Sequence, residues 1–242
     1  MKAVASSPAL REIVTSPAAF NALELLGPLS EFERRHAPET LYLQGDLSLL
    51  TVGRRVSVVG SRSPSDKGVQ RAELLSRVLV QEGFVVVSGL ALGIDTIAHE
   101  TAMAVGGRTI AVLGTPLDVA YPARNRDLLE RIRSEHLAIS QFPIGYPQRR
   151  ENFPQRNRTM ALISDATVIV EASETSGTRH QGWEALRLGR TVFLMQNVVD
   201  DPALTWPSEM IRYGAQVLTR DALPDALAEV PEFTSSGIEL AL

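Results

Sequence analysis

The sequence predicts an α/β fold, in which helices cover both faces of an open, mostly parallel sheet. Short apolar runs recur from Arg54 onward, and they are continuous rather than alternating, which is typical of strands buried on both faces. A helical stretch follows each run, and this alternation produces right-handed βαβ units and a doubly wound sheet. The runs end in Gly, Ser or a carboxylate, so polar residues gather at one edge of the predicted sheet.

Hydrophobic periodicity places the elements of this sheet. Strands are expected at residues 56–59, 85–87, 110–113, 138–142, 168–170, 192–195 and 216–218. Helices are expected at residues 66–82, 95–105, 125–135, 157–164, 179–188 and 207–213. The first helix carries an apolar stripe from Val69 to Leu79 and stops at Gly83, a residue typical of helix C-termini. The second helix is expected to begin at Asp95, a good N-cap residue.

The chain divides into three predicted segments. They are an N-terminal helical extension and lead-in at 1–50, the main domain at 51–220 and a C-terminal tail at 221–242. In the first, proline near a helix start predicts helices at 8–14 and 17–26, and a short strand follows at 40–45. The tail holds one weak helix at 223–229, and we expect it to fray from Pro231.

The composition is that of a globular protein, with 44% hydrophobic and 21% charged residues. No stretch approaches the roughly 18 apolar residues of a membrane span, and the N-terminus lacks the apolar segment of a secretory signal. The absence of cysteine excludes disulfides, thiolate metal sites and cysteine nucleophiles. We therefore expect a cytoplasmic protein with no membrane contact.

The net charge of −4 means that nucleic-acid binding, if present, must use a local basic patch. Residues 149–158 form such a patch, because they hold four arginines against one acid. Within it, Phe153, Arg156, Asn157 and Arg158 combine an aromatic face, an amide and two guanidinium groups, which suit bases and phosphates. We predict that they contact a nucleotide or a single nucleic-acid strand. The alternative is a solvated basic loop with Phe153 in the core.

Glycine-rich turns at the predicted strand ends indicate phosphate binding, because ligands of doubly wound sheets lie outside the carboxyl ends of the strands. Glycine admits a phosphate to backbone N–H groups, and a helix N-terminus favours negative charge. The candidate phosphate contacts are Gly60, Ser61, Arg62, Ser88, Gly89, Gly93, Gly177 and Thr178. Each turn alone is equally typical of an ordinary strand-to-helix connection, so the hypothesis depends on their convergence.

Other polar residues near these turns are candidate nucleotide contacts. They are Asp95, Gly114, Tyr121, Asn125 and Glu171. For Asp95 the favoured alternative is a helix cap, and for Tyr121 it is a structural anchor. His180 and Glu184 lie four residues apart on one predicted helix face, but no third metal ligand is recognisable, so we expect no metal and no cofactor.

Together these motifs resemble the DNA-processing protein A (DprA/Smf) family. The resemblance runs from Pro38 to about Arg190, and its most specific parts are Val59-Gly-Ser-Arg62, Ser88-Gly-Leu-Ala-Leu-Gly-Ile-Asp95 and Asn152-Phe-Pro-Gln-Arg-Asn-Arg158. It implies an extended Rossmann-like fold that binds single-stranded DNA without established catalytic activity. It also implies a homodimer that protects incoming DNA and loads the RecA recombinase in natural transformation.

The chain departs from the family pattern at strand carboxyl ends. The family usually has Arg at Leu92, Gly at Pro116, a different sequence at 177–184 and Val-Pro-Gly at 195–197. These changes are expected to alter the pocket rather than the scaffold. Since Gly177-Thr178 with Glu184 faintly resembles the nucleotide phosphoribohydrolases, a nucleotide-binding enzyme or sensor is the alternative hypothesis.

Overall fold

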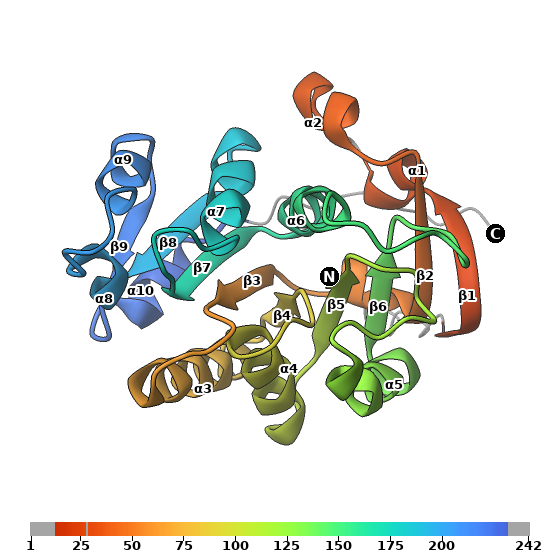
Figure 1. Ribbon diagram of the computed structural model, residues 1–242, viewed down its shortest axis with the longest axis horizontal. Helices are drawn as coiled ribbons and strands as arrows, with labels where there is room; N and C mark the ends of the chain where they lie inside the picture. Colours follow the sequence, from red (N-terminus) through yellow and green to blue (C-terminus); the bar gives the residue numbers. More distant parts are fainter. Residues whose placement is uncertain (1–12, 28, 232–242) are drawn as a thin grey trace, which may run out of the picture.

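The computed structural model describes residues 13–27 and 29–231, and within them all strands form one sheet (Figure 1). The strand order is β1-β2-β6-β5-β4-β3-β7-β8-β9. The strands are β1 (Ile13–Asn21), β2 (Thr40–Asp46), β3 (Arg55–Gly60), β4 (Val85–Ser88), β5 (Thr109–Leu113), β6 (Leu137–Ser140), β7 (Ala166–Glu171), β8 (Thr191–Met195) and β9 (Gln216–Leu218). Strands β3 to β9 pair in parallel, so the predicted α/β fold class is confirmed.

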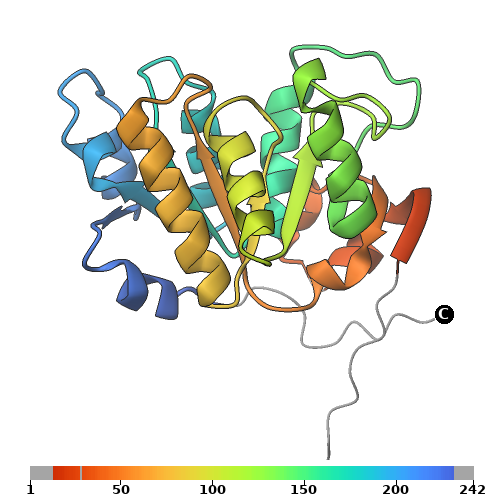
Figure 2. The same cartoon turned by 90° about the horizontal axis from the view of Figure 1, so that it is seen from below.

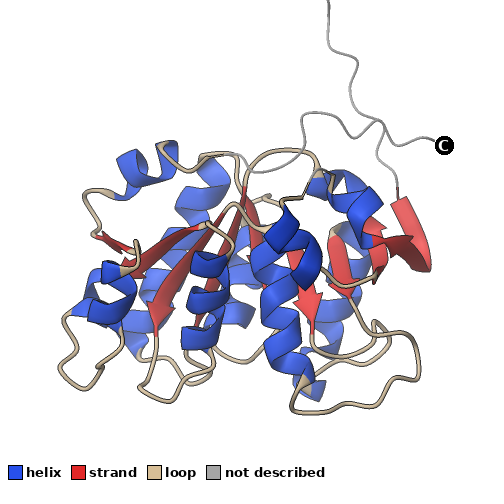
Figure 3. Cartoon of the chain, turned by 90° about the horizontal axis from the view of Figure 1, so that it is seen from above, coloured by secondary structure: helices blue, strands red, loops and turns tan. Residues whose placement is uncertain are grey.

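Helices cover both faces of the sheet, as predicted. On one face lie α3 (Asp66–Gln81), α4 (Ile94–Ala104) and α5 (Arg126–Glu135), which Figure 2 shows side by side. On the other face lie α6 (Asn152–Ile163) and α7 (Thr178–Arg187), the side from which Figure 3 views the molecule. The shorter helices are α1 (Ala22–Leu26), α2 (Glu31–His36), η1 (Leu47–Leu50), η2 (Ala123–Asn125), α8 (Gln196–Val199), α9 (Pro207–Arg212) and α10 (Leu223–Ala228).

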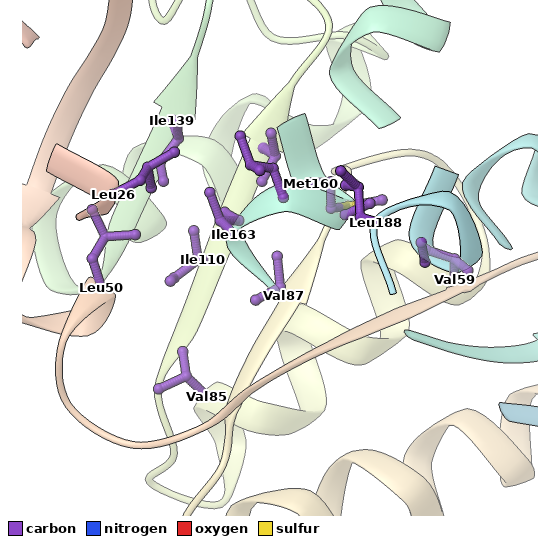
Figure 4. Packing of buried hydrophobic residues seen from close by; sticks show 14 of the residues in the cluster. Leu26, Leu50, Val59, Val85, Val87, Ile110, Ile139, Met160, Ile163 and Leu188 are labelled. Atoms are coloured by element: carbon purple, nitrogen blue, oxygen red, sulfur yellow. The ribbon is translucent and has the colours of Figure 1, made fainter. Parts of the chain in front are cut away.

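The continuous apolar strands are buried on both faces. Val85 and Val87 of β4 pack in the cluster that contains Met160 of α6, part of which Figure 4 shows. Val86, between them, belongs to the cluster on the opposite face, together with Ala98 of α4. Each such side chain contributes about 1.5–3 kcal/mol when it is fully buried. This burial explains why the strands read as unbroken apolar runs in the sequence.

The N-terminal prediction is partly wrong. Residues 17–26 were expected to form one helix, but residues 13–21 form β1, and only residues 22–26 are helical, as α1. Strand β1 is an antiparallel edge strand whose pairing with β2 is irregular between Val14 and Ala18. An edge strand with a bulge tolerates Pro17, which lacks a backbone N–H. Residues 8–12 of the other expected helix and the expected fraying after residue 231 lie outside the described residues.

The order in which strands are added to the sheet reverses at β3. Strands β4, β5 and β6 are added on one side of β3, and the chain then returns through α6 to place β7 on the other side. The end of this crossover is fixed by the buried Arg55, whose Nε donates to Ile163 O at 2.6 Å and whose backbone N donates to Asp165 Oδ2 at 2.6 Å. Sheets of this kind bind ligands where the strand order reverses, which here is at the carboxyl ends of β3 and β7.

Candidate nucleic-acid interface

A cleft of about 450 Å³ occupies this point of reversal. Four segments that are far apart in the sequence line it, namely the loop after β3, the residues around the start of α4, helix α6 and the loop that leads into α7. The predicted site residues in its lining are Gly60, Ser61, Arg62, Asp95, Phe153, Arg156, Asn157, Gly177 and Thr178. The convergence of these segments was expected, because parallel strands bring their carboxyl ends to one edge.

The arginine-rich segment becomes helical earlier than predicted. We expected a turn at residues 152–156 and a helix only from 157, but α6 begins at Asn152. Asn152 is buried, and its Nδ2 donates to Pro147 O at 3.2 Å. Pro154 lies in the first turn, where a backbone N–H would have no partner within the helix, so proline does not interrupt it. The helical start turns Arg156 and Asn157 into the protein.

Arg156 supports the floor of the cleft and is only 6% exposed. Its Nη1 donates to Gly89 O and, at 3.0 Å, to Val112 O, while its Nε donates to Asn157 Oδ1 at 3.0 Å. The guanidinium therefore joins α6 to the segment that follows β4 and to strand β5 itself. A methyl group at Gly89 would overlap this guanidinium, so glycine is required there.

Asp95 compensates the charge of this buried guanidinium. Its Oδ2 accepts hydrogen bonds from Gly89 N at 3.1 Å and Ala91 N at 3.3 Å. The expectation that Asp95 is the N-cap of its helix is wrong, because Gly93 occupies that position and Asp95 holds the preceding loop instead. Burial raises the pKa of Asp95, and the charge of Arg156 opposes this rise. Burial also lowers the pKa of Arg156, and the charge of Asp95 opposes that fall.

The rim of the cleft is open to solvent. Arg62 is exposed there, and Phe153 is half-buried beside Tyr121, with the two ring centroids 5.2 Å apart. A side chain at Gly114 would lie 2.7 Å from the Phe153 ring, so this glycine makes room for the aromatic pair. A small hollow of about 70 Å³ continues the cleft past Arg62, Leu92 and Tyr121. The rim thus offers one guanidinium and two aromatic rings to a ligand.

The two loops on either side of the cleft are joined to each other. Thr178 Oγ1 donates to Gly60 O at 3.2 Å, and Asn157 Nδ2 lies 3.5 Å from Gly177 O. Ser176 Oγ accepts the backbone N–H of Thr178 at 3.1 Å, which orders the start of α7. These contacts fix the width of the cleft.

Several predicted site residues have other partners within the fold. Ser88 Oγ donates to Val58 O at 2.7 Å, and Asn125 Nδ2 donates to Leu90 O at 3.0 Å. Glu171 accepts hydrogen bonds from the backbone and hydroxyl of Ser65, at 2.9 and 2.5 Å. Arg158, Gly89, Gly93, Gly114 and Tyr121 also lie outside the lining of the main cleft.

Met160 of α6 and Gln181 of α7 line the cleft but were not among the predicted site residues, and His180, which was considered only for a metal or a nucleotide enzyme, lines it as well. Gln181 is buried, and neither atom of its amide has a hydrogen-bond partner among the residues that the structure describes. A polar residue at a core-facing position of the predicted helix 179–188 was the available signal.

Neither a metal site nor a membrane span is found in the described part of the chain. No group of three or more potential metal ligands occurs there. Glu184, which was considered with His180, instead pairs with Arg158 at 3.0 Å and with Arg187 at 2.9 Å. Within the same residues, no helix combines the length and apolar character needed to cross a bilayer.

Comparison with known proteins agrees with the predicted resemblance. The family model for DNA recombination-mediator protein A matches residues 27–228. Protein Smf of Synechocystis is 42% identical over 177 residues, which are 73% of this chain and 44% of the relative. DNA processing protein DprA of Bacillus subtilis is 33% identical over 195 residues, which are 81% of this chain and 65% of the relative. The chain therefore spans less than two thirds of the length of either relative.

Solved structures give the same result. DprA from Streptococcus pneumoniae superposes with a TM-score of 0.77 at 35% identity, covering 89% of this chain and 75% of that one. A Helicobacter pylori DprA structure, described for its single-stranded DNA binding mode, superposes with a TM-score of 0.75 at 25% identity. The match covers 90% of this chain and 98% of that one. The chain belongs to the DNA recombination-mediator protein A family, which includes the proteins named DprA and Smf.

Proposed function

We propose that this protein binds single-stranded DNA in the cleft at the carboxyl ends of β3 and β7. The observation that carries the proposal is the rim, where the exposed Arg62 stands beside the aromatic pair of Phe153 and Tyr121. A guanidinium binds phosphate oxygens, and aromatic rings stack on bases without regard to sequence. This pairing suits a flexible strand whose bases are not already paired.

The strand is expected to enter along the loop before α6. Arg149 and Arg150 are both exposed there, directly before the helix that carries Phe153. Together with Arg62 they provide local positive charge on a chain whose net charge is −4. The buried Arg156 is expected to shape the floor of the site rather than to contact phosphates.

The wider role follows from the family. We propose that the protein protects incoming single strands and delivers them to the RecA recombinase, acting in the cytoplasm as a homodimer. The Helicobacter relative, whose binding of single-stranded DNA is described, is matched over 98% of its chain, which supports transfer of that property. The alternative of a nucleotide-cleaving enzyme is less well supported, because Glu171 and Glu184 are both held by other side chains.

The test is fluorescence anisotropy of labelled oligo-dT at low and moderate salt, with and without excess AMP or NAD. We expect binding that neither nucleotide displaces and that weakens with salt, with a slope of about −0.7 per neutralised phosphate. Phe153→Ala should cost about 1–3 kcal/mol of binding free energy through lost stacking. Phe32→Ala is the control, because Phe32 is an exposed aromatic on α2 outside the cleft lining. Equal affinities for the two variants, or binding that does not respond to salt, would contradict the proposal.

A further inference from the structure

A second cavity, of about 530 Å³, lies at the β9 end of the sheet. It is lined by α3, by the start of α8 and by the turn between β9 and α10, elements that lie at the same end of the molecule in Figure 1. Its floor is apolar, because Leu75, Leu218 and Leu223 contribute buried side chains. Leu74 extends this apolar surface to the solvent, where it is 38% exposed.

Three cations converge on this cavity. Lys67 and Arg71 lie one turn apart on the same face of α3, and Arg220 reaches it from the turn after β9. Among the described residues, none of the three forms an ion pair. The carboxylate of Asp200, which also lines the cavity, accepts a hydrogen bond from Gln196 Nε2 at 2.6 Å.

Several other arginines have a counterion within reach. Arg35, Arg133 and Arg187, for example, each pair with a glutamate on their own helix. The three cations outnumber the single carboxylate of Asp200, so the cavity carries an excess of positive charge that a bound anion would offset. The apolar floor below the cations indicates a ligand that carries an apolar or aromatic part as well as a charge.

We propose that this cavity is a binding site for a free nucleoside phosphate. Lys67, Arg71 and Arg220 bind its phosphates, and the base lies on the leucine floor. The exposed amides of Gln70 and Gln196 offer donors and acceptors to the edge of the base. The lining also includes Met195 and Asn197.

The proposed site is separate from the DNA cleft. A shallow hollow between them is lined by three carboxylates, Glu171, Asp200 and Asp201, against one guanidinium, that of Arg71. This acidic strip repels a polyanion, so a continuous DNA strand that leaves the cleft has no favourable path into the second cavity. A small nucleotide from solution reaches the cavity without crossing the strip.

The experiment is isothermal titration calorimetry of the full chain with ATP, adenosine and inorganic phosphate. ATP should bind more tightly than phosphate, and adenosine should bind most weakly. Arg71→Ala and Arg220→Ala should each raise the Kd for ATP about tenfold or more, as expected when a charge-assisted hydrogen bond is lost. Arg77→Ala is the matched control, because Arg77 is an exposed arginine on the same helix outside the cavity lining. Thermal unfolding without ligand checks that each variant is folded.

Three results would overturn the assignment. The first is the absence of ATP binding at millimolar concentration, and the second is an equal Kd in Arg71→Ala and Arg77→Ala. The third is loss of ATP binding in Arg62→Ala or in the presence of oligo-dT, which would place the nucleotide in the DNA cleft. Because oligo-dT binding is measured separately and depends on Phe153, failure of this site is distinguishable from failure of the DNA proposal.

Discussion

The floor and the rim of the cleft use arginine in opposite ways. On the floor, Arg156 is 6% exposed, donates to two backbone carbonyls and lies close to the buried Asp95. On the rim, Arg62 is exposed and forms no ion pair with any described residue. One residue type therefore stabilises the fold on the floor of the cleft and presents charge to solvent on its rim.

This difference separates stability from binding within a single site. A buried guanidinium that has lost its water is stable only while its donors and its charge remain compensated. A solvated guanidinium has no such requirement and remains available to a ligand. Changes on the floor should therefore alter the free energy of unfolding, whereas changes on the rim should alter DNA affinity alone.

The largest expected effect is that of Arg156→Ala. The free energy of unfolding should fall by about 3–5 kcal/mol, because Asp95 is left as an uncompensated buried charge. The carbonyl oxygens of Gly89 and Val112 also lose their donor. Urea denaturation measures the change.

Arg158→Ala is the control for this prediction, because Arg158 lies on the same helix but its side chain is 40% exposed in the pair with Glu184. That change should cost at most about 1 kcal/mol. If both variants lost the same stability, the floor would not have the structural role assigned to it.

The next largest effect concerns pH and His99, which is fully buried on α4 one turn after Asp95. Its Nδ1 lies 2.7 Å from Thr109 Oγ1, whose only proton goes to Val86 O, so Nδ1 carries the proton of the neutral ring. Nε2 has no partner among the described residues. Burial, followed by the charges of His136 and Arg156, lowers the pKa of His99 to about 3.

The sign of the pH effect follows from these values. The unfolded chain protonates His99 as the pH falls below its ordinary pKa of 6.5, while the folded protein does so only near 3, so acid favours unfolding across that interval. Between pH 7 and pH 5 the loss should be about 2 kcal/mol. His99→Asn should flatten the dependence of unfolding free energy on pH. An unchanged slope would show that His99 titrates normally in the folded state.

Much of the main sheet could be predicted from the sequence. Every strand expected from residue 56 onward is present, because runs such as Val85–Val87 are apolar at consecutive positions only when both faces are buried. The convergence of Gly60, Phe153 and Gly177 was also predictable, because parallel strands direct their carboxyl ends to one edge.

The errors have physical causes that lie outside local sequence. Strand β1 contains Pro17 and two alanines, which favour a helix start, and only its pairing with β2 makes it a strand. The sequence also could not show which arginines of α6 face inward. Arg156 and Arg158 are two residues apart on one helix. Their hydrogen-bond partners, Val112 for Arg156 and Glu184 for Arg158, decide which of them is buried, and both partners are distant in the chain.

Arg62→Ala is expected to have the smallest effect on the free energy of unfolding, and it tests the comparison between rim and floor most directly. The free energy of unfolding should change by less than about 0.5 kcal/mol, because no described contact is lost. Oligo-dT affinity should fall about fivefold at low salt, or about 1 kcal/mol, as expected for an exposed ionic contact. The slope of binding against salt should also shrink by about 0.7, because one fewer phosphate is neutralised.

Arg77→Ala, which removes the same charge outside the cleft, should leave the slope unchanged. A large loss of stability in Arg62→Ala, or an unaltered slope, would mean that the rim and the floor are not distinct. If the predictions for Arg156→Ala and Arg62→Ala both hold, the same cleft contains one arginine that is necessary for folding and one whose removal weakens DNA binding alone.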